Sequence, residues 1–87
     1  MKNAYVIKDE IVVQVIDNKI VLLNPETSKL HTLNNTASFI LQKLQKNVPL
    51  EQIEEMVKRK FDVSQEIARK DTNQFIGTLK KNGILMF

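Results

Sequence analysis

The sequence contains no cysteine among its 87 residues, and it has only two glycines and one histidine. Without cysteine, the chain can form no disulfide, no thiol nucleophile and no thiolate metal site. The two glycines, Gly77 and Gly83, lie apart, so they do not make the clustered glycine loop that cradles a phosphate. These absences exclude several common designs for catalysis and cofactor binding.

The remaining residues that carry catalytic chemistry are also isolated. His31 has no aspartate or glutamate beside it, and such a histidine is more often an ordinary strand side chain than a catalytic base or metal ligand. The carboxylates Glu51, Glu54 and Glu55 fall on the exposed side of a predicted helix, whereas a catalytic pair normally needs burial. We therefore expect no enzyme activity, no metal and no cofactor.

Long apolar segments are missing as well. The first eight residues lack the apolar core of a secretory signal peptide, and no apolar run approaches the length of a membrane span. A chain of this length makes one domain, residues 1–87, and buries only about 60–65% of the surface that its unfolded form exposes. We expect a cytoplasmic protein that does not contact a membrane.

The net charge is +3, from 13 Lys and Arg against 10 Asp and Glu, and a basic chain is a candidate for nucleic-acid binding. However, Lys58-Arg59-Lys60 and Lys80-Lys81 fall in the last turns of predicted helices, while Glu51 and Glu66 fall in first turns. This placement complements the helix dipole and needs no polyanion to explain it. Nucleic acid is therefore not the expected partner.

Three short segments rich in apolar and β-branched residues predict strands at Ile11–Ile16, Ile20–Leu23 and Leu30–Leu33. Between the first two, Asn18 tolerates a positive φ and predicts a tight hairpin turn, and Pro25 sets the bend of the next turn. Strands joined by tight turns are antiparallel neighbours.

The second half of the chain predicts three helices. The first begins at Asn34 or Asn35, the second opens near Pro49, and the third is capped by Ser64 and ends before Gly83. Each helix has one apolar stripe, and on the third helix the stripe is Ala68, Thr72, Phe75 and Leu79. A three-stranded antiparallel sheet followed by three helices is an α+β domain that resembles a winged helix-turn-helix.

A strand at the edge of this sheet is the best candidate for a binding site. An edge strand has unpaired N–H and C=O groups and can accept another chain by β-augmentation, although a short solvated edge is the plainer alternative. The third strand, Lys29–Leu33, is short and lacks proline. On the third helix Ile76 is an apolar residue beside the stripe, either at the margin of the core or on the floor of a groove between helix and strand.

Several motifs together resemble a known family. They are Val21-Leu22-Leu23-Asn24, Leu33-Asn34, Thr36-Ala37, Ile40-Leu41 and Leu44, followed by Glu51, Ile53, Phe61-Asp62-Val63, Asp71, Phe75, Leu79 and Gly83-Ile84-Leu85. In order and spacing they are similar to the PqqD-like proteins, the recognition elements of ribosomal peptide modification pathways, which include stand-alone leader-binding proteins of lasso-peptide pathways. The chain departs from the family pattern at Ala37, where glycine is frequent, and at Leu41, where an aromatic residue is frequent.

The resemblance implies a function. In this family the leader of a precursor peptide adds as an extra strand to the third strand and packs against the last helix, and the complex serves a radical-SAM maturase or a leader peptidase. Because leaders are often acidic, Arg69 and Lys80 would assist binding by attraction. We also expect a monomer or a weak dimer. Carried over by position, the peptide-binding residues are Lys29, Leu30, His31, Thr32, Leu33, Arg69, Thr72, Asn73, Ile76, Leu79 and Lys80.

Two other functions remain open at this point. In a winged-helix DNA-binding protein, the third helix would offer Gln65, Arg69, Asn73 and Gln74 to the bases. The same helix carries the acidic residue Glu66, which disfavours this role. The other alternative is a structural subunit of a larger complex.

Overall fold

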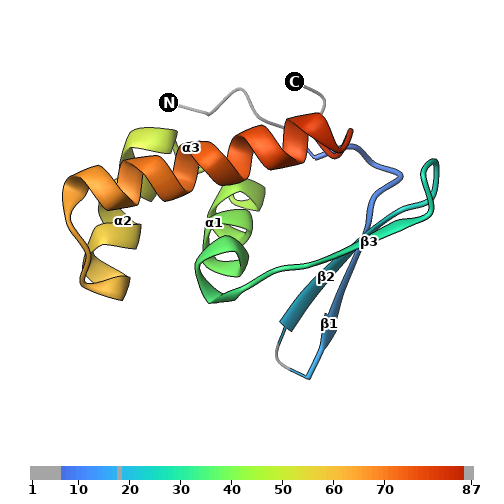
Figure 1. Ribbon diagram of the computed structural model, residues 1–87, viewed down its shortest axis with the longest axis horizontal. Helices are drawn as coiled ribbons and strands as arrows, with labels where there is room; N and C mark the ends of the chain where they lie inside the picture. The colour runs from blue at the N-terminus through green and yellow to red at the C-terminus, as the bar shows by residue number, and fades with distance from the viewer. Residues whose placement is uncertain (1–6, 18, 86–87) are drawn as a thin grey trace.

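The computed structural model describes residues 7–17 and 19–85. Its elements in chain order are β1 (Val12–Ile16), β2 (Lys19–Asn24), β3 (Lys29–Thr32), α1 (Asn35–Gln45), α2 (Leu50–Phe61) and α3 (Gln65–Lys81). The strands form one antiparallel sheet in the order β1-β2-β3, and α3 lies across the other two helices (Figure 1). The predicted α+β fold with a winged helix-turn-helix arrangement is confirmed, and the strand bounds agree within one residue.

The central strand β2 attaches the sheet to the helices. Ile20, Leu22 and Asn24 alternate along it and are buried, because successive side chains of a strand point to opposite faces. Leu22 is opposite Val13 of β1 and His31 of β3, so these three side chains share the face that is turned toward the helices. The turn before β2 has its positive φ at Asp17, and the predicted turn residue Asn18 lies outside the described residues.

Local signals define the helix ends. The Asn34 side chain accepts a hydrogen bond from the N–H of Ala37 at 2.8 Å, so the first of the two candidate asparagines is the N-cap of α1. Ser64 caps α3 in the same way, through the N–H of Ile67 at 3.1 Å. Gly83, with φ of +70°, follows α3 in the left-handed conformation that glycine adopts without strain.

The core contains one apolar stripe from each helix. The buried residues of α3 are Ala68, Thr72, Ile76 and Leu79, so the predicted stripe is wrong at one position: Ile76 is in the core and Phe75 is only half-buried. A stripe through Phe75 and a stripe through Ile76 both have helical spacing, and the packing of α3 on α1 and α2 buries the stripe through Ile76. Within the described residues, no helix is both long and apolar enough to cross a membrane.

The buried hydroxyl of Thr72 predicts a stabilising substitution. Its Oγ1 atom is buried without a hydrogen-bond partner among the described residues, and an unpaired buried polar group lowers stability. Thr72→Val keeps the shape and removes that group, so we expect the free energy of unfolding to rise by about 1 kcal/mol. In a domain of this size, that corresponds to a Tm increase of roughly 4–8 °C in a thermal melt.

Thr78→Val is the matched control, because Thr78 is exposed on the same helix and its hydroxyl donates to the carbonyl of Gln74 at 3.0 Å. We expect no gain in Tm from this control. Equal melting of Thr72→Val and the parent protein would show that the Thr72 hydroxyl has a partner in solution.

Candidate functional site

The outer edge of β3 is open, and its hydrogen-bonding register is fixed by the structure. The N–H of Leu33 donates to the carbonyl of Ile20 at 2.9 Å. Hydrogen-bonded and non-hydrogen-bonded pairs alternate along antiparallel strands, so Lys29 and His31 also bond to β2. The backbone N–H and C=O groups of Leu30 and Thr32 therefore point away from the sheet.

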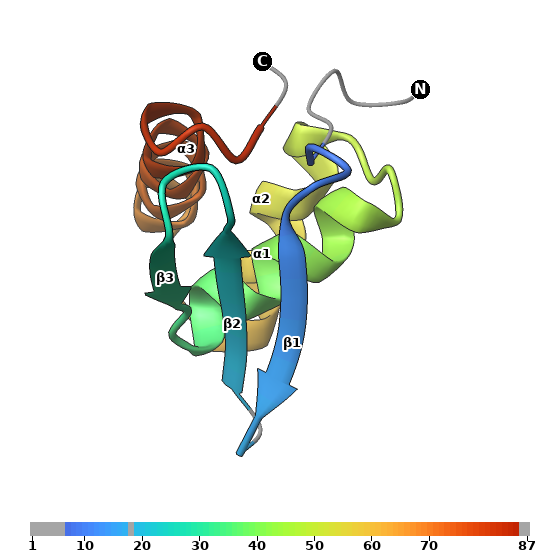
Figure 2. The same ribbon diagram turned by 90° about the vertical axis from the view of Figure 1, so that its right-hand side faces the viewer.

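Helix α3 lies on the β3 side of the sheet, away from β1 (Figure 2). No Cα atom of β3 lies within 8 Å of a Cα atom of α3, so the strand and the helix are neighbours without close backbone packing. The side chain of Asn24 links the turn before β3 to the end of α3. Its Nδ2 donates to the carbonyl of Asn82 after α3 at 3.1 Å, and its Oδ1 accepts from the N–H of Glu26 at 3.0 Å.

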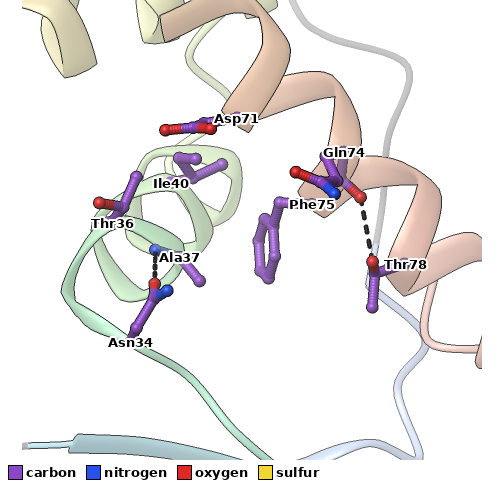
Figure 3. Close-up of a pocket in the computed structure, with 8 residues that line it drawn as sticks. All are labelled: Asn34, Thr36, Ala37, Ile40, Asp71, Gln74, Phe75 and Thr78. Atoms are coloured by element: carbon purple, nitrogen blue, oxygen red, sulfur yellow. Dashed lines mark hydrogen bonds between the residues drawn. The ribbon is translucent and has the colours of Figure 1, made fainter. Parts of the chain in front are cut away.

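A pocket of about 280 Å³ lies where β3 leads into α1. Figure 3 shows the ring of Phe75 projecting from α3 into the space above the first turn of α1, with Asp71 beside Ile40. Asp71 is the one charged residue that lines this pocket. The lining residues are Asn34, Thr36, Ala37 and Ile40 from the start of α1, and Asp71, Gln74, Phe75 and Thr78 from α3.

A second pocket, of about 230 Å³, lies at the beginning of β3. Its charged lining residues are Lys8, Lys29 and Lys81 together with one acid, Glu26. Strand β3 thus runs from a mainly basic pocket to a pocket whose single charge is acidic. We call the open edge of Leu30 and Thr32 together with these two pockets the β3–α3 site.

His31 contributes an unusual polar atom to this site. The residue is half-buried on the helical face of β3, and its Nε2 atom is buried without a hydrogen-bond partner among the described residues. Leaving a buried polar atom unpaired costs about 1–3 kcal/mol.

The predicted strand residues are all located at this edge. Lys29, Leu30 and Thr32 are exposed, His31 is half-buried, and Leu33 is buried where β3 leads into the first helix.

The predicted helix residues line neither of the two pockets. Thr72, Ile76 and Leu79 are at most 5% exposed, so their side chains belong to the core and cannot form the wall of an open groove. Arg69, Asn73 and Lys80 are exposed, but a rotation of about 100° per residue places them on the flank of α3 opposite Asp71 and Gln74. The Nε of Arg69 is 3.6 Å from Oε1 of Glu54 on α2, which confirms the direction of this flank.

Four α3 residues that were not among the predicted binding residues line the first pocket, namely Asp71, Gln74, Phe75 and Thr78. The predicted core stripe included Phe75, whereas the packing of α3 buries Ile76. A stripe through Ile76 would have identified Phe75 as a margin residue. Peptide binding by Arg69, Asn73 and Lys80 on the other flank stays a prediction.

The chemistry of the site favours binding. In the described part of the chain no group of three or more His, Cys, Asp or Glu residues is arranged to hold a metal ion. The site instead offers unpaired backbone groups, an aromatic wall and different charges at its two ends. These are the features of a surface that accepts an extended peptide.

Comparison with known proteins identifies similar molecules. The family model described as "Coenzyme PQQ synthesis protein D (PqqD)" matches residues 19–85. A structure described as "Lasso peptide synthetase B1 complexed with the leader peptide" is 25% identical, with a TM-score of 0.89 over 95% of this chain and 98% of that chain. A second, "TbiB1 in Complex with the TbiA(beta) Leader Peptide", is 26% identical, with a TM-score of 0.84 over 99% and 95%. Curated protein sequences give no significant match.

The bridge made by Asn24 leads to a prediction about stability. The residue is 4% exposed, and Asn24→Ala leaves the carbonyl of Asn82 and the N–H of Glu26 without their partner. We expect the free energy of unfolding to fall by about 1–3 kcal/mol in urea denaturation. Thr27→Ala is the control in the same turn, since its exposed hydroxyl accepts only a long bond from the N–H of Lys29 at 3.4 Å. Equal losses from the two substitutions would contradict the role given to Asn24.

Proposed function

Because the chain belongs to the PqqD family, we propose that it binds the leader of a ribosomally synthesised precursor peptide and presents that peptide to a modifying or processing enzyme. The two similar structures support this proposal, since each is described as a complex with a leader peptide. The protein acts by recognition and has no catalytic role of its own. The enzyme that receives the peptide is a radical-SAM maturase or a leader peptidase, and the complex works in the cytoplasm where the precursor is made.

The observation that carries the proposal is the open edge of β3. Leu30 and Thr32 direct their backbone N–H and C=O groups outward, so an extended leader can pair with them as a fourth strand. Helix α3 lies on the β3 side of the sheet, so a strand added at this edge would run beside the helix (Figure 2). Main-chain bonds of this kind supply affinity, and the pockets beside them select side chains.

The pockets predict which leader residues fit. Side chains of a paired leader alternate between faces, and those on the helical face of the sheet reach Phe75 and Asp71 at one end and Lys29 and Lys81 at the other. An apolar or aromatic side chain suits the ring of Phe75. A hydrogen-bond donor or basic group suits Asp71, and an acidic group suits the lysines. Exposed charge pairs of this type contribute about 0.2–1 kcal/mol each.

A DNA-binding role has weaker support. Of the four α3 residues that it requires, Arg69 is paired with Glu54, and Gln74 lines the first pocket on the opposite flank from Asn73. The ion pair directs Arg69 toward α2. Specific DNA binding in the nanomolar range at physiological salt, measured by fluorescence anisotropy, would favour this role over peptide binding.

Proline substitutions along β3 test the edge. Thr32→Pro and Leu30→Pro each remove an outward N–H that β2 does not use, so we expect both variants to fold while leader affinity falls about 2–10-fold for each lost bond. His31→Pro is the contrasting variant, because it removes a bond to β2 and lowers stability. Thermal melts combined with calorimetric titration of a cognate leader separate the two effects. Unchanged affinity in both outward variants would exclude β-augmentation at β3.

A pair of alanine variants tests which flank of α3 binds the leader. Phe75 lines the first pocket and Asn73 lies on the opposite flank. We expect Phe75→Ala to weaken leader binding on the order of tenfold, or about 1.4 kcal/mol, and Asn73→Ala to leave it unchanged. Titration below the melting temperature of both variants keeps the comparison within the folded state. If Asn73→Ala weakened leader binding and Phe75→Ala did not, the leader would contact the flank of Arg69 and Asn73 instead.

A further inference from the structure

Two aromatic rings and two lysines form a patch where α1 meets the end of α2. Phe39 and Phe61 are half-buried, their rings pack against the core, and they meet edge to face with centroids 5.7 Å apart. The Nζ atom of Lys43 lies 5.1 Å from the centroid of the Phe39 ring, and the Nζ atom of Lys60 lies 5.5 Å from it. Both distances are within the range of a cation–π contact. We call these four residues the Phe39 patch.

A pocket of about 420 Å³ opens beside this patch, and we call it the α1–α2 pocket. Its lining residues are Asn35, Ser38, Phe39 and Gln42 from α1, and Lys60 and Phe61 from α2. Lys60 is the one charged residue among these lining residues. An occupant therefore meets an aromatic wall with positive charge at its rim.

The charge around this pocket has one sign. Between Glu26 and Glu51 the sequence contains no Asp or Glu, so α1 has no acidic residue. Among the described residues neither Lys43 nor Lys60 forms an ion pair, and the exposed Asp62 after α2 does not line the pocket. The helix dipole favours lysines in these last turns, but it does not account for the aromatic pair and the pocket beside them. The surface is complementary to a partner with negative charge.

The α1–α2 pocket lies on the flank of α1 that is opposite the β3–α3 site. From α1, the first pocket is lined by Thr36, Ala37 and Ile40, and the α1–α2 pocket by Asn35, Ser38, Phe39 and Gln42. At about 100° per residue, these two sets point to roughly opposite sides of the helix. A peptide bound at the β3–α3 site therefore leaves the Phe39 patch uncovered.

We propose that the Phe39 patch docks the enzyme that receives the leader, through an acidic segment of that enzyme with an apolar side chain among its carboxylates. This inference rests on the proposed function, because a protein that presents a bound peptide needs a second surface for the enzyme. The apolar side chain enters the α1–α2 pocket against the ring of Phe61, and the carboxylates meet Lys43 and Lys60. Aromatic residues are enriched at protein interfaces, and charge complementarity selects the partner.

A single-stranded nucleic acid is the other class of partner that binds aromatic rings beside lysines, since bases stack on the rings and phosphates meet the lysines. The geometry disfavours this partner. The ammonium groups of Lys43 and Lys60 lie over the ring of Phe39, and the ring of Phe61 packs edge to face with it at an interplanar angle of 85°. The rings therefore do not offer the open, parallel faces on which successive bases stack.

Short synthetic peptides test the chemistry of the patch. We expect acetyl-Glu-Glu-Phe-Glu-Glu-amide, titrated into ¹⁵N-labelled protein, to shift the amides of residues 39–43 and 60–61 with a Kd of about 1 mM. Lys60→Glu should weaken binding at these residues about fivefold. Lys70→Glu, the same charge change on an exposed position of α3, should leave it unchanged. The peptide with lysines in place of the glutamates should not bind the patch.

Three results of this titration would overturn the proposal. They are equal shifts from both peptides, unchanged binding of the acidic peptide by Lys60→Glu, and displacement of the acidic peptide from the patch by a thymidine oligonucleotide of about eight residues at physiological salt. The last result would assign the patch to nucleic acid.

A processing assay separates this inference from the proposed function. The double variant Lys43→Glu with Lys60→Glu leaves the β3–α3 site intact, so calorimetric titration should give the parent's affinity for a cognate leader. With the purified maturase or peptidase and a cognate precursor, the double variant should require about tenfold more protein than the parent for half-maximal processing. A parent protein that does not bind the leader would contradict the proposed function and this inference with it. Normal leader binding together with normal processing in the double variant would contradict docking at the Phe39 patch alone.

Discussion

The side chain of Asn24 is the interaction on which the arrangement of the molecule depends. It is almost fully buried, it donates to the carbonyl of Asn82 beyond α3, and it accepts from the N–H of Glu26 in the turn before β3. The amide therefore joins a local turn to a segment 58 residues further along the chain. Because the turn is tied to the end of α3, strand β3 starts beside that end of the helix.

The central position of β2 determines what the two edges offer. In an antiparallel sheet each residue directs both backbone groups to the same side, so the residues of β2 that bond to β3 cannot bond to β1. The bond from Leu33 to Ile20 therefore sets the pattern for the whole sheet. It leaves Leu30 and Thr32 outward at one edge, and Val13 and Val15 outward at the other. The first of these edges is the one that we propose for the leader peptide.

The two edges differ in how they are protected. The β3 edge is accompanied by α3 and by charged groups, with lysines at one end and Asp71 at the other. In the proposed complex these surroundings would restrict which leader side chains fit. Strand β1 has no charged residue of its own, and its Val13 lines a pocket beside the end of α1.

The sequence by itself determined the elements of the fold, because the signals for them are local. Asn34, Ser64 and Gly83 mark helix ends through bonds and conformations within a few residues, and the alternation of Ile20, Leu22 and Asn24 marks the buried face of β2. The family motifs likewise indicated leader binding at the third strand.

Only the tertiary structure decided which flank of α3 faces that strand. Stripes through Phe75 and through Ile76 both satisfy helical spacing, and they differ by a rotation of about 100°. Packing against α1 and α2 buried Ile76, which turned Phe75 and Asp71 toward the start of α1 and Arg69 toward α2. The outward direction of the backbone N–H and C=O groups of Leu30 and Thr32 also depended on the pairing of β3 with β2. The sequence of one strand alone does not determine which of its residues bond to a neighbouring strand.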